Sequence, residues 1–147
     1  MNRRLRFWIC LMGGALLFIW GNSLLPAKQS GALSGWLHDL LTTFLPEGSG
    51  ASGGDGLLRK IAHFTEFALL GGVLCRLFRI KGESFPVAGA LSIGCGFFAA
   101  CVDELLQHLS PGRSPSLRDV CIDLAGVLTG ALLYLAAAYI RKQKNQK

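Results

Sequence analysis

The sequence is poor in charged residues for its length. Only 16% of its 147 residues are Asp, Glu, Lys or Arg, whereas a soluble domain carries about 25%. The charges that remain sit in short blocks between long apolar stretches, and 51% of the chain is hydrophobic. This distribution argues against a water-soluble core and is typical of an integral membrane bundle. We find no internal repeat, and nothing in the length requires a second domain.

The sequence also lacks the common metal and redox motifs. It has no CxxC, CxxH or HExxH spacing, so we expect neither a metal nor another cofactor. A net charge of +6 does not indicate nucleic-acid binding here, because the basic residues flank apolar stretches instead of covering a soluble face. All five cysteines lie in apolar segments, and we interpret them as small residues at helix contacts: Cys10, Cys75, Cys95, Cys101 and Cys121.

Four apolar stretches are long enough to cross a bilayer. At 1.5 Å per residue, each can span the ~30 Å hydrocarbon layer as a helix, and lipid offers no partners for free backbone groups. The first stretch is long for a signal peptide and has only a weak cleavage site, so we expect an uncleaved helix. We therefore predict a single all-α transmembrane domain over 1–147. Its spans are 5–25, 57–80, 85–109 and 117–140, followed by a basic tail over 141–147.

The basic residues predict the orientation of these spans. If the N-terminus is cytoplasmic, segments 3–6, 76–81 and 141–147 lie inside, and they hold most of the fifteen Lys and Arg residues. Cytoplasmic segments carry an excess of Lys and Arg. We therefore predict a multi-pass protein of the plasma membrane with both termini in the cytoplasm.

The first external segment contains a further amphipathic pattern. Apolar residues recur at helical spacing over 33–45, and the Gly/Ser-rich stretch 47–56 that follows is typical of a flexible linker. We expect a short helix over 33–45 that lies in the outer membrane interface. A lid packed over the bundle is the alternative.

Ionisable residues within and beside the spans collect at one end of the predicted bundle. Each would cost about 2.5–3.5 kcal/mol at the centre of a bilayer, so we expect them to face inward and to pair. In the topology above they form an outward-facing binding pocket. Its predicted residues are Lys60, His63, Glu66, Asp103, Gln107, Arg113, Asp119 and Asp123.

Other interpretations of this polar group remain open. It can be a structural network that locks the helices together. Arg59, Arg118 and Glu104 can simply reach the interface as helix-end charges. Lys60 and Arg113 are candidate ion-pair partners for the carboxylates.

Helical spacing supports convergence of these residues. Polar residues one turn apart form stripes on the last three spans. Gly126 and Gly130 continue the stripe of the fourth span as a GxxxG pattern, and Ala90 and Gly94 have the same separation, which suggests close helix packing. The stripes pair Lys60 with His63, Asp103 with Gln107, and Asp119 with Asp123.

Two segments resemble motifs of the VanZ-like membrane proteins. KIAHFTEFALLG (60–71) resembles the first, and DELLQHLSPGRSPSLRDVCIDLAG (103–126) resembles the second, in the same order and at similar separation. The resemblance covers about 57–130. It implies that these motif residues are functional: Lys60, His63, Phe64, Asp103, Glu104, Gln107, Pro111, Gly112, Arg113, Asp119 and Gly126.

This chain departs from the family pattern at three positions. The family commonly has Asn at the position of Asp123, often Tyr at that of Phe67, and an aromatic residue at that of Leu109. The change at Asp123 adds a negative charge. One family member is associated with resistance to teicoplanin-type lipoglycopeptides, so the resemblance implies a role at the cell envelope.

Three functions fit these observations. The favoured one is a binding module whose pocket holds a membrane lipid, a lipid-linked envelope precursor or a lipoglycopeptide antibiotic, with Lys60 and Arg113 contacting phosphate. The second is an intramembrane enzyme that uses acid–base chemistry on lipid headgroups. The third is a small transporter or proton relay, which would need a homo-oligomer to complete a pathway. The candidate catalytic residues are His63, Glu66, Asp103 and Glu104. A metal held by His63, Glu66, His108 and Asp119 is disfavoured, because no metal-binding spacing supports it.

Overall fold

The computed structural model describes residues 2–25, 54–110 and 116–145, and these residues form four helices and no strand. Each helix is long and apolar enough to cross a membrane, which confirms the predicted multi-pass, all-α fold. The predicted interfacial helix over 33–45 and Arg113 lie outside the described residues. The helices are α1 (Arg3–Ser23), α3 (Gly54–Ile80), α4 (Phe85–His108) and α5 (Leu117–Lys144).

The helix ends lie within three residues of the predicted spans except at the C-terminal end of α5. α5 continues through 141–144, where the sequence analysis placed a basic tail. Its final turn carries Arg141, Lys142 and Lys144, and cations are favourable at the negative end of a helix dipole. At the other ends, the Asn2 side chain caps α1 and the Ser116 side chain caps α5. Each accepts a backbone N–H at 3.2 Å.

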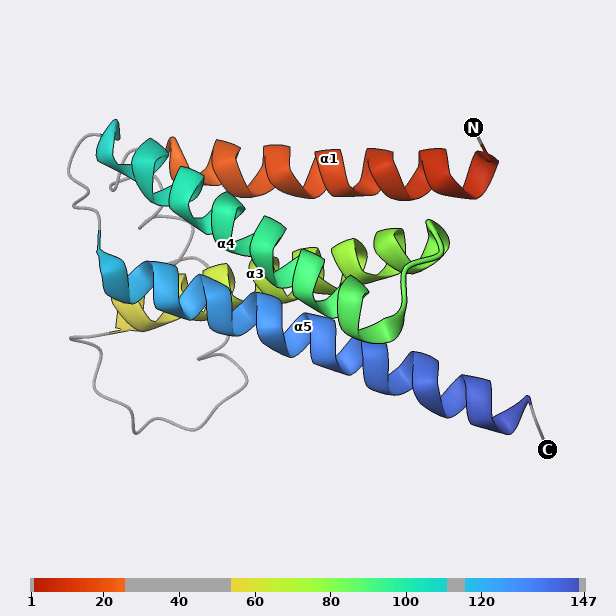
Figure 1. Ribbon diagram of the computed structural model, residues 1–147. Coiled ribbons are helices and arrows are strands. Elements are labelled where there is room, and N and C mark those ends of the chain that lie inside the picture. The colour runs from red at the N-terminus through yellow and green to blue at the C-terminus, as the bar shows by residue number, and fades with distance from the viewer. Residues whose placement is uncertain (1, 26–53, 111–115, 146–147) are drawn as a thin grey trace, which may run out of the picture.

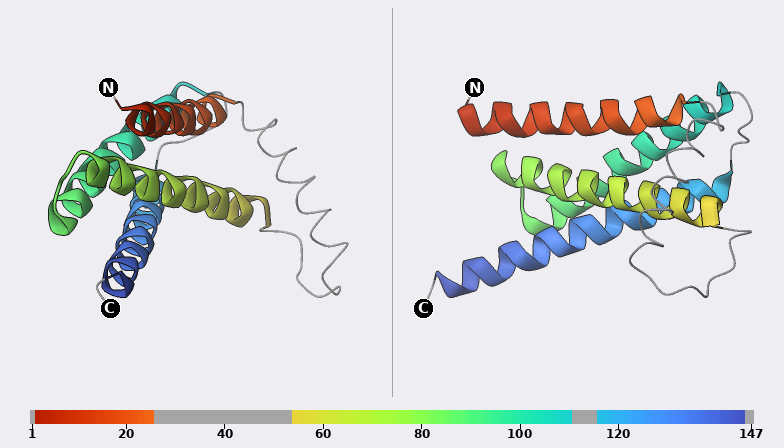
Figure 2. Two further views of the ribbon diagram at one scale, coloured as in Figure 1. Left: turned by 90° about the vertical axis from the view of Figure 1, so that its right-hand side faces the viewer. Right: turned by 180° about the vertical axis from the view of Figure 1, so that it is seen from behind.

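α3 lies at the centre of the bundle and contacts the other three helices (Figure 1). The core around it contains seven buried residues, of which only Ile19 comes from α1. The two further views show α5 diverging from α1 toward its C-terminus (Figure 2). The buried core residues are Ile19, Phe67, Leu70, Leu74, Ala99, Ala100 and Val127.

Close packing of α3 against α5 depends on glycine. A side chain at Gly126 would collide with the carbonyl oxygen of Phe64, and one at Gly130 with that of Ala68. The GxxxG prediction for α5 is therefore confirmed. The parallel prediction for Ala90 and Gly94 is wrong, because both residues are exposed on α4.

The cysteine prediction is largely wrong as well. Cys75 is buried, but Cys10, Cys95 and Cys121 are exposed and Cys101 is only partly buried. Large apolar residues such as Phe98 and Leu133 are exposed on the same outer surface. Small apolar residues tolerate this lipid-facing surface as well as a helix contact, since lipid is itself apolar.

The first turn of α1 and the last turn of α5 lie at the same end of the bundle (Figure 1). The turn between α3 and α4 lies at this end as well, and its Gly82 adopts the left-handed conformation at φ +96°. We call this the basic end, defined by Arg76, Arg79, Arg141 and Lys142. The opposite end holds residues 59–66, 103–110 and 116–123, and we call it the polar end.

Candidate functional site

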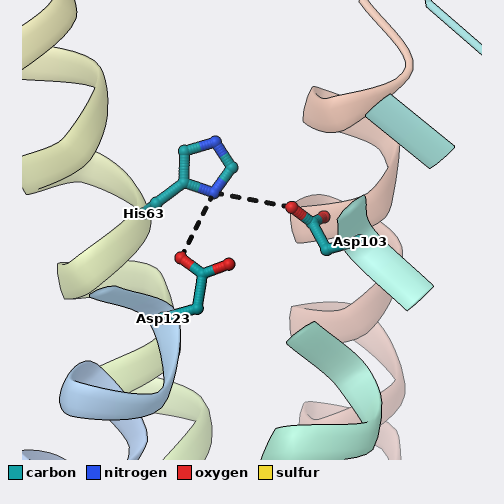
Figure 3. Close-up of side chains that lie close together, drawn as sticks. All are labelled: His63, Asp103 and Asp123. Carbon is teal, nitrogen blue, oxygen red and sulfur yellow. Dashed lines mark ion pairs between the residues drawn. The ribbon is translucent and has the colours of Figure 1, made fainter. Parts of the chain in front are cut away.

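Three helices bring one histidine and two aspartates together at the polar end. His63 of α3 points between Asp103 of α4 and Asp123 of α5 (Figure 3). Its Nδ1 atom lies 3.6 Å from Asp103 Oδ2 and 3.8 Å from Asp123 Oδ1. We call these three residues the His–Asp–Asp cluster. The predicted convergence of polar side chains from three spans is observed at these residues.

The cluster is almost completely buried. The exposed fractions are 8% for His63, 0% for Asp103 and 1% for Asp123. Gln107, one turn after Asp103, donates a hydrogen bond from Nε2 to Asp103 Oδ2 at 2.8 Å. Neither carboxylate oxygen of Asp123 accepts a hydrogen bond from any described residue. Burying two carboxylates with so few donors is costly unless a cation or a proton accompanies them.

A small cavity of about 10 Å³ borders the cluster. This volume is enough for about one water molecule. Lys60 and Arg59 line it and are both partly exposed, whereas the wall formed by His63 and Asp123 is buried. The complete lining is Arg59, Lys60, His63, Gln107, Asp119, Ile122 and Asp123.

The family model for VanZ/LLP1 matches residues 7–139, which is most of the chain. The chain belongs to the VanZ/LLP1 family. The match extends beyond the two motifs to residues 7–23 of α1, outside the segment 57–130 that carries the sequence resemblance. No curated protein and no solved structure matches the chain.

The cavity of this VanZ/LLP1 protein gathers most of the predicted pocket residues. Asp103 does not line the cavity but contacts two residues that do, His63 and Gln107. The predicted residues that line the cavity are Lys60, His63, Gln107, Asp119 and Asp123. The proposed ion pairs of Lys60 are not present, since no carboxylate of the described residues forms a salt bridge with it. Lys60 is therefore placed as a cavity-lining cation.

Glu66 lies apart from the cluster. Its Oε1 atom accepts a hydrogen bond from Asn22 Nδ2 of α1 at 3.3 Å, so this carboxyl joins α3 to α1. Asn22 was not among the residues predicted from the sequence. An amide at the end of an otherwise apolar span was the available signal.

Glu104 and His108, one turn apart on α4, have different surroundings in this VanZ/LLP1 protein. Glu104 is buried, and its Oε2 accepts a hydrogen bond from the backbone N–H of Ser116 at 2.8 Å. Because Ser116 caps α5, this contact fixes the start of α5 to α4. His108 is exposed at the end of α4. Ser110, also not predicted, bonds to the end of α1, with its hydroxyl 3.0 Å from the carbonyl oxygen of Leu25.

The basic end has a different kind of cavity. It has a volume of about 630 Å³, and three arginines and a lysine contribute to its lining. The Arg76 guanidinium donates to the Tyr134 hydroxyl at 3.3 Å and lies over the Trp8 ring at 5.8 Å. The Arg79 guanidinium lies 4.0 Å from the centre of the Phe85 ring. Aromatic faces thus hold both cations at an open surface.

Proposed function

We propose that this VanZ/LLP1 protein binds the phosphate headgroup of an envelope lipid at the polar end, on the outer side of the plasma membrane. The observation that carries the proposal is the cavity in which Arg59 and Lys60 stand beside the polar wall formed by Gln107. Arginine offers a planar fork for phosphate oxygens, and lysine adds a point charge. The predicted topology, with both termini cytoplasmic, puts this cavity at the outer surface.

The cavity volume decides where such a phosphate binds. About 10 Å³ cannot enclose a headgroup. The phosphate therefore lies at the partly exposed side, against Arg59 and Lys60, with the acyl chains in the surrounding bilayer. Asp119 lines the same cavity and repels an anion, which keeps the phosphate on the α3 side.

Photo-crosslinking in nanodiscs tests this proposal. The two probes are a photoactivatable phosphatidic acid and a photoactivatable polyprenyl phosphate, which distinguish a glycerophospholipid from a lipid-linked precursor. We expect one of them to label peptides of the polar end, and we expect Arg59→Ala/Lys60→Ala to lose this labelling at least tenfold. Lys142→Ala/Lys144→Ala removes the same charge at the opposite end and serves as the control. Equal loss in both double variants, or labelling confined to the basic end, would reject the proposal.

Binding of an envelope lipid provides a route to lipoglycopeptide resistance. A protein that occupies or shields a lipid at the outer surface reduces access of a drug that inserts an acyl chain there. We expect expression of this chain to raise the inhibitory concentration of teicoplanin more than that of vancomycin. A photoactivatable teicoplanin that labels the polar end would instead identify the drug as the ligand.

A second candidate function is an intramembrane enzyme. The observation in its favour is that His63 Nδ1 faces two buried carboxylates, an arrangement that can orient an imidazole as a general base. Purified protein incubated with labelled envelope lipids tests it, with His63→Gln against His108→Gln as the matched pair. Turnover lost only in His63→Gln supports the enzyme. No observation favours a transporter, because the apolar core formed by Phe67, Leu70 and Leu74 separates the two ends.

A further inference from the structure

The geometry points to a divalent metal site: we propose that His63, Asp103 and Asp123 bind one Zn²⁺ ion. One ligand atom from each residue lies within 4.8 Å of the others. Around a tetrahedral zinc ion with ligand bonds of about 2.0–2.2 Å, the ligand atoms lie about 3.4 Å apart. The observed separations of 3.6 and 3.8 Å from His63 Nδ1 approach this value. Small side-chain rotations complete the coordination.

The second observation is the state of the Asp123 carboxylate. It is 1% exposed, it points at His63 (Figure 3), and neither of its oxygens accepts a hydrogen bond from the described residues. No Lys or Arg in the described part of the chain forms a salt bridge with Asp103 or Asp123. Two buried carboxylates therefore share one imidazole. A dication supplies the positive charge that this group needs.

The surroundings of the cluster match those of a metal centre. Gln107 donates to Asp103 Oδ2, and ligating carboxylates usually have such a supporting hydrogen bond. The cavity lined by His63 and Asp123 has room for about one water molecule. Three protein ligands with a fourth position open to water are typical of non-structural zinc sites. The ligands come from α3, α4 and α5, so the ion also links these three helices.

The donor set selects the ion. Imidazole favours zinc and other transition metals, whereas all-oxygen sites favour Mg²⁺ and Ca²⁺. One imidazole with two carboxylates therefore suits Zn²⁺ best and Mn²⁺ next. The sequence did not predict this site, because its ligands come from three separate helices and share no short motif. The inference goes beyond the proposed lipid binding and does not depend on it.

Metal content of the full-length protein in nanodiscs tests the inference. After chelator treatment and dialysis against Zn²⁺, elemental analysis is expected to find one zinc per wild-type chain. Asp123→Asn and His63→Gln should each weaken zinc binding at least tenfold. Glu66→Gln and His108→Gln are matched controls, since each makes the same chemical change outside the cluster, and they should bind as wild type does. Co²⁺ in place of zinc should give the visible absorption of a tetrahedral site in the wild type and lose it in the first two variants.

Three results would overturn the site. The first is a wild-type protein that takes up neither Zn²⁺ nor Mn²⁺ stoichiometrically. The second is an Asp123→Asn variant that binds zinc as tightly as wild type does. The third is a pair of control variants that weaken zinc binding as much as Asp123→Asn and His63→Gln do. Helical circular dichroism and a monodisperse elution profile establish that each variant is folded. If Asp123→Asn fails to fold, His63→Gln and the rise of the wild-type melting temperature on adding zinc provide the decision. If zinc uptake is absent but lipid labelling is intact, only the zinc site is rejected. If zinc is bound but lipid labelling is absent, only the lipid proposal is rejected.

Discussion

The two ends of the bundle handle charge in opposite ways. At the polar end, Asp103 and Asp123 are 0% and 1% exposed, beside a cavity of about 10 Å³. At the basic end, Arg76 and Arg79 are partly exposed around a cavity of about 630 Å³ and rest on aromatic rings. The first arrangement removes charge from solvent, whereas the second leaves it accessible.

This difference predicts different sensitivity to mutation. Buried charges depend on their partners, since removing one partner leaves another charge without compensation. Exposed charges are hydrated and screened by salt, so each contributes little to the free energy of unfolding. The polar end should therefore be intolerant of single changes, and the basic end tolerant.

The largest expected effect comes from His63→Ala in chelator-treated protein. The change leaves two buried aspartates without their imidazole, and breaking a buried ion pair typically costs about 3–5 kcal/mol. Unfolding in SDS titrations measures the loss. His108→Ala, at an exposed histidine of α4, should change the free energy of unfolding by less than about 0.5 kcal/mol. Similar losses of unfolding free energy in both variants would show that the buried histidine is no more important to stability than the exposed one.

A somewhat smaller effect is expected for Gly130→Ala. Its added methyl group would collide with the Ala68 carbonyl oxygen and push α5 away from α3, the two helices that carry Asp123 and His63. Overpacking of this kind typically costs about 1–3 kcal/mol. Gly94→Ala is the control, because nothing lies within 4 Å of an added Cβ there. If the melting temperature falls by the same amount in both variants, the tight α3–α5 contact does not hold the polar end together.

The four helices and the glycine contact of α5 could be predicted from the sequence. Hydropathy and length located all four helices, because lipid forces apolar segments of fixed length to be helical. The cost of burying charge predicted that His63, Asp103 and Asp123 converge. Which of the polar residues meet depends on helix rotation and tilt, and spacing within one helix does not fix either quantity.

Glu66 illustrates this limit. It lies three residues from His63, yet it turns toward α1 and accepts a hydrogen bond from Asn22. Glu104 shares a helix with Asp103 but binds the backbone of Ser116. Ala90 and Gly94 had the spacing of a packing motif, but they lie on a surface that no described helix covers. For Glu66 and Glu104, the neighbouring segment decided the role of the residue.

The attachment of α1 extends the comparison between the ends. At the polar end, two contacts hold α1. Asn22 donates a hydrogen bond to Glu66 of α3, and the Ser110 hydroxyl donates to the carbonyl oxygens of the two residues after Ser23. At the basic end, the Trp8 ring lies beneath the Arg76 guanidinium. Asn22→Ala removes a donor to a carboxyl group and should cost about 1 kcal/mol or slightly more. Hydrogen exchange in α1 should then speed up most at residues 19–23, and a uniform increase along the helix would contradict localised attachment.

The smallest expected effect is that of Arg79→Ala at the basic end. The cation–π contact with Phe85 is partly exposed, and such contacts contribute about 0.5–1 kcal/mol. Salt distinguishes this loss from one at the polar end, because ions reach an open cavity of about 630 Å³ but not a buried cluster. Raising the ionic strength should therefore shrink the difference between wild type and Arg79→Ala, while the larger deficit of His63→Ala stays nearly constant. If both deficits respond to salt alike, the two ends do not differ in how far their charges are removed from solvent.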